Sequence, residues 1–227
     1  MDPLHYTWWL ASRAAGIVGF SALGVVALLG LVSALRLTSP ATAARLRPWH
    51  ERLALTGLGC TAAHGLLLLA DPWLHPGVLG VLVPLTMHYR PLWTGLGILA
   101  GYALAGFGLS YYLRGRIGAR RWRSAHRFAS AAFVLGAIHA LGAGTDARSA
   151  LLLPVILALG GTVLLLGAAR GWGLGRPPAP AGRVRPPTPA APSAAAASSP
   201  VPSASAPAPA RTSTGPPQPL WSAGSFD

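Results

Sequence analysis

The chain contains five uncharged segments, and each is long enough for a helix that crosses a membrane. A helix needs roughly 17 to 25 mostly apolar residues to cross a hydrocarbon core about 30 Å thick. Because this core offers no water, the backbone must satisfy its own hydrogen bonds, and a helix does so. The sequence therefore predicts an all-α integral membrane protein, a bundle of about five transmembrane helices. The five segments are residues 14–35, 53–70, 91–113, 128–145 and 149–169.

The composition agrees with a membrane location. Of the 227 residues, 52% are hydrophobic and only 10% are charged, and the mean hydropathy is +0.47. Glycine and alanine are frequent within the apolar segments, as in "GLGILAGYALAGFG". Small residues let helices in lipid approach one another closely. We therefore expect a compact bundle whose outer surface contacts membrane lipid.

Arginine supplies all the basic charge, since the chain has a net charge of +13 and no lysine. A basic chain can bind nucleic acid, but these arginines gather in alternate loops, which instead predicts membrane topology and no nucleic-acid partner. Cytoplasmic loops carry the arginine excess. We expect a multi-pass protein of the bacterial cytoplasmic membrane, with its N-terminus outside and its C-terminus cytoplasmic. The rich loops hold Arg45, Arg47, Arg52, Arg114, Arg116, Arg120, Arg121 and Arg123, and the intervening loops hold Arg90 and Arg148.

Two parts of the chain lie outside the five segments. Residues 76–87 are apolar but too short to span and are broken by prolines, so we expect them at the outer surface, with a re-entrant path left open. Beyond residue 170, proline, alanine and serine dominate. This change predicts a membrane domain over residues 1–170 and a disordered tail over residues 171–227. Neither part contains a glycine-rich nucleotide loop, so no flavin or nicotinamide domain is expected.

Four of the seven histidines form two similar arrangements. His50 and His64 belong to the second predicted helix, and His126 and His139 belong to the fourth. An ionisable side chain inside a membrane is costly and is usually functional. Each arrangement extends roughly 20 Å along a helix. Both helices are entered from the arginine-rich side and run parallel, so His50 is expected to face His126, and His64 to face His139 at another depth.

Two imidazoles that face each other inside a bundle suit a haem iron bound on both axial sides. Because no axial position then remains for oxygen, the predicted chemistry is electron transfer. The spacing of His126 and His139 does not fit a single straight helix. At 100° per residue, fourteen positions return within roughly 40° of the starting face, whereas thirteen miss it by roughly 140°. The fourth helix must therefore be tilted or irregular, or must offer its ligands from different sides.

With these residues, the sequence resembles the ferric reductase-like transmembrane domain family, the haem-bearing membrane part also found in NADPH oxidases. The resemblance covers about residues 8–169. The two spaced histidine pairs are its specific part. Four further stretches contribute, namely "SRAAGIVGF", "RPLWTGLGILAGY", "LRGRIGARRWRSAH" and "HALGAGTD". Many members of the family have six spans, whereas this chain has five strong ones.

The resemblance implies two haem b groups, an inner one bound by His50 and His126 and an outer one bound by His64 and His139. It also implies propionate or donor contacts for the arginines near Arg121 and Arg123. Electrons would pass from a separate cytoplasmic or membrane donor, a flavoprotein or a quinol, to an extracytoplasmic acceptor, with ferric iron as one candidate. The chain would be an oxidoreductase component. A haem subunit that delivers electrons to a partner methionine-sulfoxide reductase is the alternative of the same kind.

Two hypotheses of other classes stay open. One is a haem-free membrane scaffold that acts through its arginine loops and tail, and the other is a transporter with histidine proton relays. For several further residues the structural interpretation is favoured over a functional one. His75 and His88 are expected to be exposed loop residues, His5 an exposed terminal residue, Arg13 a snorkelling residue, Asp71 and Asp146 solvated helix ends, and Cys60 a packing residue.

Overall fold

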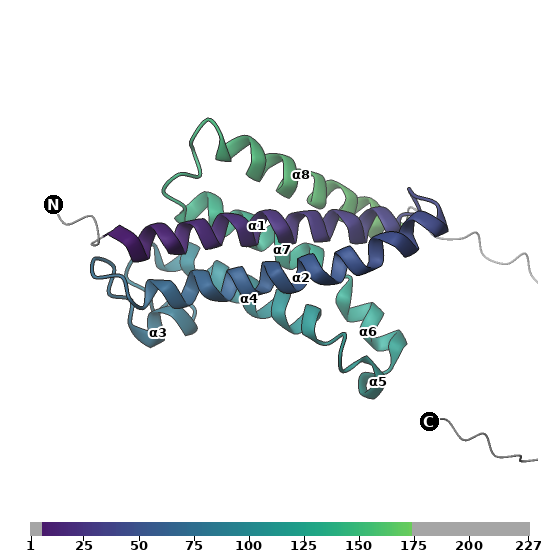
Figure 1. The fold of residues 1–227 in the computed structure, drawn as a ribbon, viewed down its shortest axis with the longest axis horizontal. Helices are drawn as coiled ribbons and strands as arrows, with labels where there is room; N and C mark the ends of the chain where they lie inside the picture. The colour runs from purple at the N-terminus through teal and green to yellow at the C-terminus, as the bar shows by residue number, and fades with distance from the viewer. Residues whose placement is uncertain (1–5, 174–227) are drawn as a thin grey trace, which may run out of the picture. The chain divides into compact units, whose positions relative to one another are not determined.

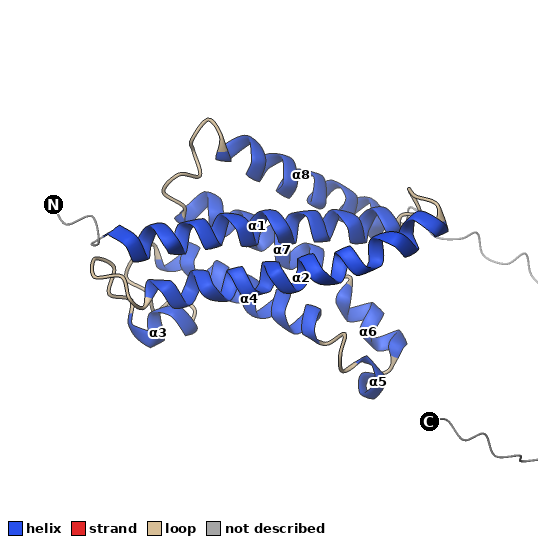
Figure 2. Ribbon diagram, viewed as in Figure 1, coloured by secondary structure: helices blue, strands red, loops and turns tan. Residues whose placement is uncertain are grey.

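The computed structural model describes residues 6–173, and every regular element in this range is a helix (Figure 2). The all-α prediction is confirmed for these residues. Most of the tail predicted over residues 171–227 lies outside the described residues. In chain order the helices are α1 Thr7–Ala34, α2 Pro40–Leu68, α3 Gly77–Leu82, α4 Pro91–Leu109, α5 Arg114–Ile117, α6 Ala119–His126, α7 Ala129–Ala143 and α8 Leu152–Gly171.

The first two helices form a long antiparallel hairpin (Figure 1). Helix α2 begins cleanly because Ser39 is its N-cap, with its side chain accepting a hydrogen bond from the Thr42 backbone N–H at 3.1 Å, and Pro40 follows in the first turn. The two helices approach closely at glycines. A Cβ placed on Gly57 would lie 2.7 Å from Leu23 Cγ. This contact matches the close packing that the small residues predicted.

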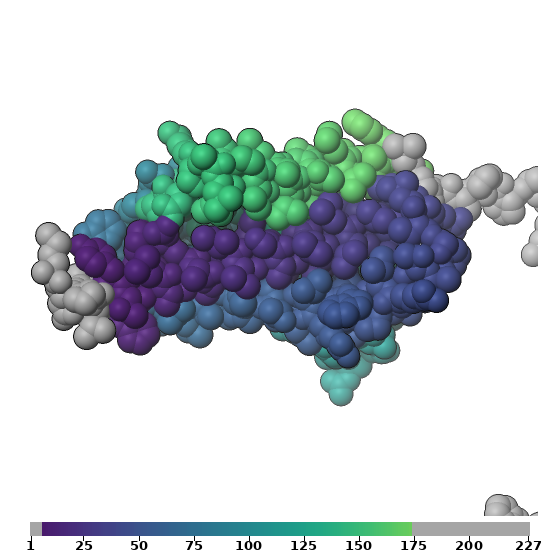
Figure 3. Space-filling view, turned by 45° about the horizontal axis from the view of Figure 1, so that its top comes forward, coloured from purple at the N-terminus to yellow at the C-terminus, as the bar shows by residue number. Residues whose placement is uncertain are grey.

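Helix α1 is the centre of the bundle. It packs against α2, α7 and α8, while α4 packs mainly against α7. The buried core joins Leu23 and Leu31 of α1 to Phe133 of α7 and Val163 of α8. Phe20 stacks on Phe133 with ring centroids 4.9 Å apart. In the space-filling view, α8 lies along α1 over much of its length (Figure 3).

Three helices are long and apolar enough to cross a membrane, namely α1, α4 and α8. Helix α2 has 29 residues, but arginines in its first half, two histidines and small polar residues lower its hydropathy. Helix α7 has only 15 residues, about 22 Å at 1.5 Å per residue, because the chain turns just before Ala129 and leaves the helix at Gly144. A membrane protein is thus supported, and the count of five spans stays a prediction.

The apolar segment 76–87 forms one short helix and a loop. Helix α3 has six residues, too few to span a hydrocarbon core. Gly77 starts it with φ +63°, a conformation that glycine adopts at little cost. Thr86 Oγ1 donates a hydrogen bond to the Leu79 carbonyl at 2.8 Å and ties the following loop back to α3.

Candidate histidine-pair site

The structure brings the four histidines together in two pairs. The ring centroids of His50 and His126 are 6.3 Å apart with an angle of 68° between the ring planes. Those of His64 and His139 are 6.4 Å apart at 67°. These are the two pairings expected from the sequence. All four side chains are partly buried, and the pairs belong to opposite ends of the bundle, here called the His50 end and the His64 end.

Both separations suit one metal ion between two imidazoles. A metal–imidazole bond of about 2.0–2.1 Å on each side places the two ring centroids roughly 6.4 Å apart. Aromatic rings in direct contact have centroids about 4.5–7 Å apart, so these separations fit edge-to-face ring packing as well as a shared metal ion. Among the described residues, no cluster of three or more histidine, cysteine or acidic side chains is placed to hold a metal ion. The donor sets are therefore two separate imidazole pairs.

Backbone carbonyls of neighbouring helices orient three of the rings. His64 Nδ1 donates to the Ser12 carbonyl at 2.8 Å, and His139 Nδ1 donates to the Trp93 carbonyl at 2.8 Å. His126 Nδ1 donates to the Phe107 carbonyl at 3.0 Å. Because a carbonyl only accepts, each Nδ1 must carry the proton, which leaves the Nε2 lone pair for a metal.

The fourth ring, that of His50, interacts with the backbone of Val26. Val26 lies fourteen positions after Ser12 on α1, just as His64 lies fourteen after His50 on α2. The antiparallel hairpin therefore repeats the same contact at both depths. A separation of fourteen residues corresponds to about 21 Å along a helix.

The thirteen-residue separation of His126 and His139 is explained by a break in the helix. His126 is the last residue of α6, and α7 begins at Ala129 after a turn. The two rings therefore do not belong to one continuous helix, and the face that each presents is set independently. The irregular helix expected from the angular mismatch is confirmed.

Glycines opposite three of the rings make room for them. A Cβ on Gly16 would lie 2.9 Å from His64 Nδ1, and one on Gly97 would overlap the His139 ring. A Cβ on Gly30 would lie 3.4 Å from His50 Cε1. Each glycine follows the orienting carbonyl by four residues, one turn along the same helix. No residue type marks these glycines in the sequence, although the four-residue spacing recurs there as Ser12–Gly16, Val26–Gly30 and Trp93–Gly97.

A hollow adjoins the His50–His126 pair. Its cavity volume is about 120 Å³, below the roughly 300–1,000 Å³ of most cofactor pockets. Its wall is mostly aliphatic, with contributions from Leu23, Leu58 and Phe133. The polar side chains besides the histidines are those of Arg127, Ser130 and Arg170. The apolar wall with a charged edge suits the chemistry of a flat, apolar macrocycle that carries carboxylates, and the surrounding side chains would have to move apart to admit one.

The aromatic surroundings of His126 differ from those of the other ligand candidates. Trp122 stacks on the His126 ring with centroids 5.0 Å apart and an angle of 23°. Tyr111 in turn meets Trp122 edge-on at 5.7 Å. Trp122 lies one helical turn before His126 on α6, so the stack is local. It restricts the rotation of the imidazole.

Arginines are concentrated at the His50 end. The arginine-rich α5–α6 segment, the α1–α2 loop and the last turn of α8 all lie at this end (Figure 1). Arg121 and Arg123, for which the resemblance implied propionate or donor contacts, are exposed on α6 and do not line the hollow. Arg127 and Arg170 line it instead. The sequence alone did not mark these two arginines, because one follows α6 and the other lies in the last turn of α8, far apart along the chain.

Of the other residues considered in the sequence, some lie where they were expected and others do not. His75 and His88 are exposed in the loops on either side of α3, as expected, and Cys60 is half-buried on α2. His5 lies outside the described residues. The solvated state expected for Asp71 is wrong, because this residue is 3% exposed and its Oδ1 accepts the Trp73 N–H at 2.8 Å.

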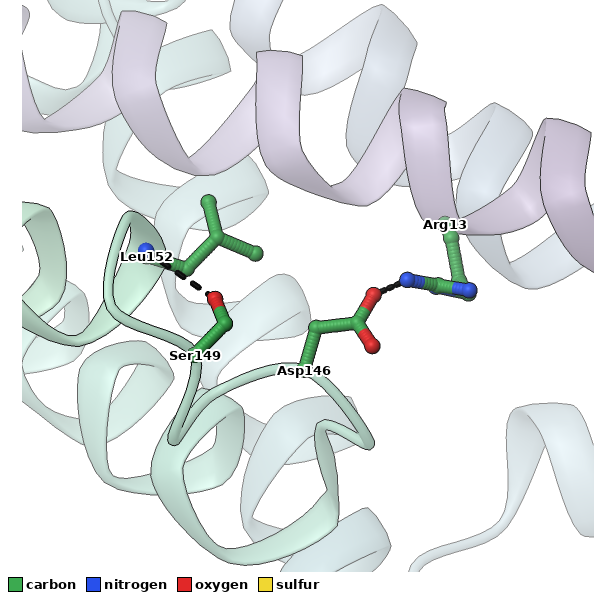
Figure 4. Close-up of polar contacts among 4 residues, drawn as sticks. All are labelled: Arg13, Asp146, Ser149 and Leu152. Atoms are coloured by element: carbon green, nitrogen blue, oxygen red, sulfur yellow. Dashed lines mark hydrogen bonds and ion pairs between the residues drawn. The ribbon is translucent and has the colours of Figure 1, made fainter.

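The solvated state expected for Asp146 is also wrong, whereas the snorkelling expected for Arg13 stays a prediction. The two side chains form an ion pair that joins α1 to the loop after α7 (Figure 4). Arg13 also lies over the Trp9 ring, 4.2 Å from its centroid. Arg13 follows Ser12, whose carbonyl orients His64, so the pair fastens the loop beside the His64 end. Sequence distance hid this contact, since the partners are separated by more than a hundred residues.

Comparisons with family models, with curated proteins and with solved structures found no match to this chain.

Proposed function

We propose that this chain is a membrane electron carrier that binds two haem b groups and belongs with the ferric reductase-like transmembrane domains. One observation carries the proposal. Two imidazole pairs have centroid separations of 6.3 Å and 6.4 Å, and a metal ion between two imidazoles calls for roughly 6.4 Å. The same separation recurs at two depths, and Nδ1 of His64, His126 and His139 faces a backbone carbonyl, which leaves Nε2 of each ring free for a metal ion.

The protein itself would hold the two haems, orient the histidine rings that bind them and shield them from water. His50 with His126, and His64 with His139, would hold the two groups, and His64, His126 and His139 would offer Nε2 because their Nδ1 donates to a backbone carbonyl. A haem bound in this way supplies one-electron chemistry at iron with no open coordination position. The aliphatic side chains around the rings exclude water, and the glycines leave room for the imidazoles.

The arrangement of the pairs supports transfer across the membrane. The two depths are about 21 Å apart along α2, a large part of a hydrocarbon core of about 30 Å. The arginine-rich His50 end would be cytoplasmic by the positive-inside rule. We therefore propose an inner site at the His50 end, supplied by a flavoprotein or a quinol, and an outer site at the His64 end. The acceptor at the outer site would be either a small oxidant such as ferric iron or a partner reductase.

The decisive experiment is a reduced-minus-oxidised absorption spectrum of the full-length detergent-purified protein, with haem quantified as its pyridine haemochrome. We expect about two b-type haems per chain. Substituting His50, His64, His126 or His139 by alanine should remove or loosen one haem each. His75→Ala and His88→Ala are matched controls, since both histidines are exposed, and they should keep the full haem content.

A colourless protein, expressed with adequate haem supply, would contradict the proposal. Unchanged haem content in all four alanine variants would also contradict it. In either case the scaffold and proton-relay hypotheses would replace it. Flux of protons into vesicles and dependence on the tail would then separate those two.

A further inference from the structure

A second cavity lies at the His64 end, between the start of α4 and the end of α7. Its volume is about 390 Å³, within the roughly 300–1,000 Å³ of small-molecule pockets. Two arginines from different loops line it together with aromatic and aliphatic residues of the two helices. The lining residues are Arg90, Trp93, Ile138, Leu141, Gly142 and Arg148.

Membrane topology does not explain the two arginines of this cavity. The positive-inside rule concentrates arginine in cytoplasmic loops, whereas Arg90 and Arg148 belong to the intervening loops. Arg13, the other arginine at this end, has a carboxylate partner in Asp146. Within residues 6–173, no carboxylate pairs with Arg90 or Arg148. Two arginines that are distant along the chain thus line one cavity without an anion from the described part of the chain.

The turn at Arg90 is held against the end of α7. Its φ is +44°, a left-handed conformation that is uncommon for a residue other than glycine or asparagine. The Tyr89 hydroxyl donates to the Ala143 carbonyl at 3.3 Å, and Arg90 Nη1 donates to the Gly142 carbonyl. Other N–H donors of the Arg90 guanidinium remain, because arginine has five.

The cavity can be reached from water. Arg90 and Arg148 are both exposed, so a dissolved anion would meet them without passing through the bundle. The Trp93 ring packs on the α7 backbone, since a Cβ on Gly142 would overlap it. This ring and Ile138 give the cavity an apolar wall beside its two cations.

We infer that this cavity is a binding site for a small anion with phosphate or carboxylate groups, held between Arg90 and Arg148. Arginine binds the oxygens of both groups through paired N–H donors, and such charge-assisted bonds are among the strongest in proteins. The start of α4 adds to the attraction, because its first turn contains no acidic residue and a helix N-terminus favours negative charge. The inference goes beyond the proposed function, since the site requires no haem.

The test is isothermal titration calorimetry of the full-length protein in a nonionic detergent at low salt, with succinate and inorganic phosphate as probes. We expect saturable binding of one anion per chain. The double variant Arg90→Gln, Arg148→Gln should bind at least about tenfold more weakly, because a single hydrogen bond to a charged group already contributes that much. Succinamide has the size of succinate without its charge and should not bind.

Matched variants separate a built site from general attraction to a basic protein. Arg116→Gln removes an exposed arginine at the His50 end and should keep the wild-type affinity. Ile138→Trp keeps both arginines but fills the cavity, so it should weaken binding. Arg90→Lys with Arg148→Lys keeps the charge without the paired donors and should give an intermediate affinity. Thermal unfolding checks that each variant is folded, and Arg148→Gln alone gives the same test in a loop.

A competition experiment separates two sources of such an anion. Phosphatidylglycerol added to the micelles should weaken succinate binding if the cavity takes the phosphate of a lipid headgroup. Phosphatidylcholine, which has no net charge, is the control lipid. Competition by phosphatidylglycerol alone would assign the site to a headgroup, and lack of competition would assign it to a dissolved anion. Both results support an anion site.

Three results would overturn the inference. They are the absence of saturable binding of both succinate and phosphate, equal binding of succinate and succinamide, and wild-type affinity in the folded double glutamine variant. An equal loss of affinity in Arg116→Gln would also overturn it, because the attraction would then be general. Haem content is measured separately, so a colourless protein that binds succinate would contradict the proposed function and leave this site in place.

Discussion

The two histidine pairs have nearly the same geometry but different surroundings. At the His64 end the imidazoles are fixed by two carbonyls at 2.8 Å, with Gly16 and Gly97 against the rings. At the His50 end Trp122 stacks on one ring, Gly30 leaves a looser fit, and a hollow with two arginines adjoins the pair.

This difference teaches that the ring separation and the environment are set by different parts of the chain. The packing of α1–α2 against α4 and α7 sets the separation at the His64 end, and α6, which contacts α4, sets it at the His50 end. The neighbouring side chains then decide how tightly each ring is held and what charge it meets. Two haems held in this way are expected to differ in affinity and potential, since potential follows hydrogen bonding, burial and nearby charge. The following variants test that contrast, from the largest effect to the smallest.

Gly97→Ala should damage the His64 end most. The added methyl group would overlap the His139 ring, and overpacking of this kind costs about 1–3 kcal/mol. We expect loss of most haem at this end, while the His50 end keeps its own. Gly106→Ala is the matched control on the same helix, because nothing lies within 4 Å of its added Cβ. Equal haem content in the two variants would contradict the close fit at Gly97.

Gly16→Ala and Gly30→Ala compare the two ends directly. The new Cβ would lie 2.9 Å from His64 Nδ1 in the first variant and 3.4 Å from His50 Cε1 in the second. Haem retention should therefore fall several-fold at the His64 end for Gly16→Ala and change little for Gly30→Ala. The measurement is the rate of haem transfer to apomyoglobin. A larger loss from Gly30→Ala would reverse the proposed order of tightness.

Trp122→Leu should loosen His126 without emptying its site. An aromatic pair contributes about 0.5–1.5 kcal/mol beyond the area it buries, so haem retention at the His50 end should fall by up to about tenfold. Trp122→Phe keeps a stacking ring, so its haem retention should lie between that of Trp122→Leu and that of the wild type. Electron paramagnetic resonance of the oxidised protein would show a change in ligand orientation at this end. Identical spectra for all three proteins would show that the stack does not orient His126.

Separating Arg13 from Asp146 should have a smaller effect on stability. Their side chains are 29% and 36% exposed, and ion pairs of this kind contribute about 0–1 kcal/mol. A double-mutant cycle with Arg13→Gln and Asp146→Asn should give a coupling energy in this range, and salt should weaken it. Thermal unfolding in detergent is the measurement. A coupling energy that does not depend on salt would argue against a simple ion pair.

Tyr112 offers the mildest test, at the His50 end and outside the membrane-spanning segments. Its hydroxyl donates to Glu51 at 2.9 Å, and this bond raises the pKa of Tyr112 above its ordinary value. The contribution to stability is therefore present below the unfolded pKa of about 10 and is lost as the pH rises through the higher folded pKa. Glu51→Gln should bring the pKa down, as measured by tyrosinate absorbance. Tyr112→Phe identifies the signal among the five tyrosines.

The lengths of the apolar runs and the spacing of the histidines predicted the helices and the two histidine pairs. The long apolar runs predicted helices, and α1, α4 and α8 bear this out as candidate spans. The spacing of His50 from His64 and of His126 from His139 predicted which rings lie together. Spacing carries this information because a helix has a fixed rise per residue, so sequence distance converts to depth; it did not give the face of His126 and His139, which lie on separate helices.

The sequence could not show which groups surround each ring. Ser12, Trp93 and Phe107 contribute backbone carbonyls, which every residue has, so no residue type marks them. The break between His126 and Ala129, the Arg13–Asp146 pair and the convergence of Arg127 with Arg170 all depend on how separate helices pack. By itself, then, the sequence determined helices and the depth of the histidines, through local geometry. Only the tertiary structure decided which partners orient the rings and where charge adjoins them, because those contacts join segments that are distant along the chain.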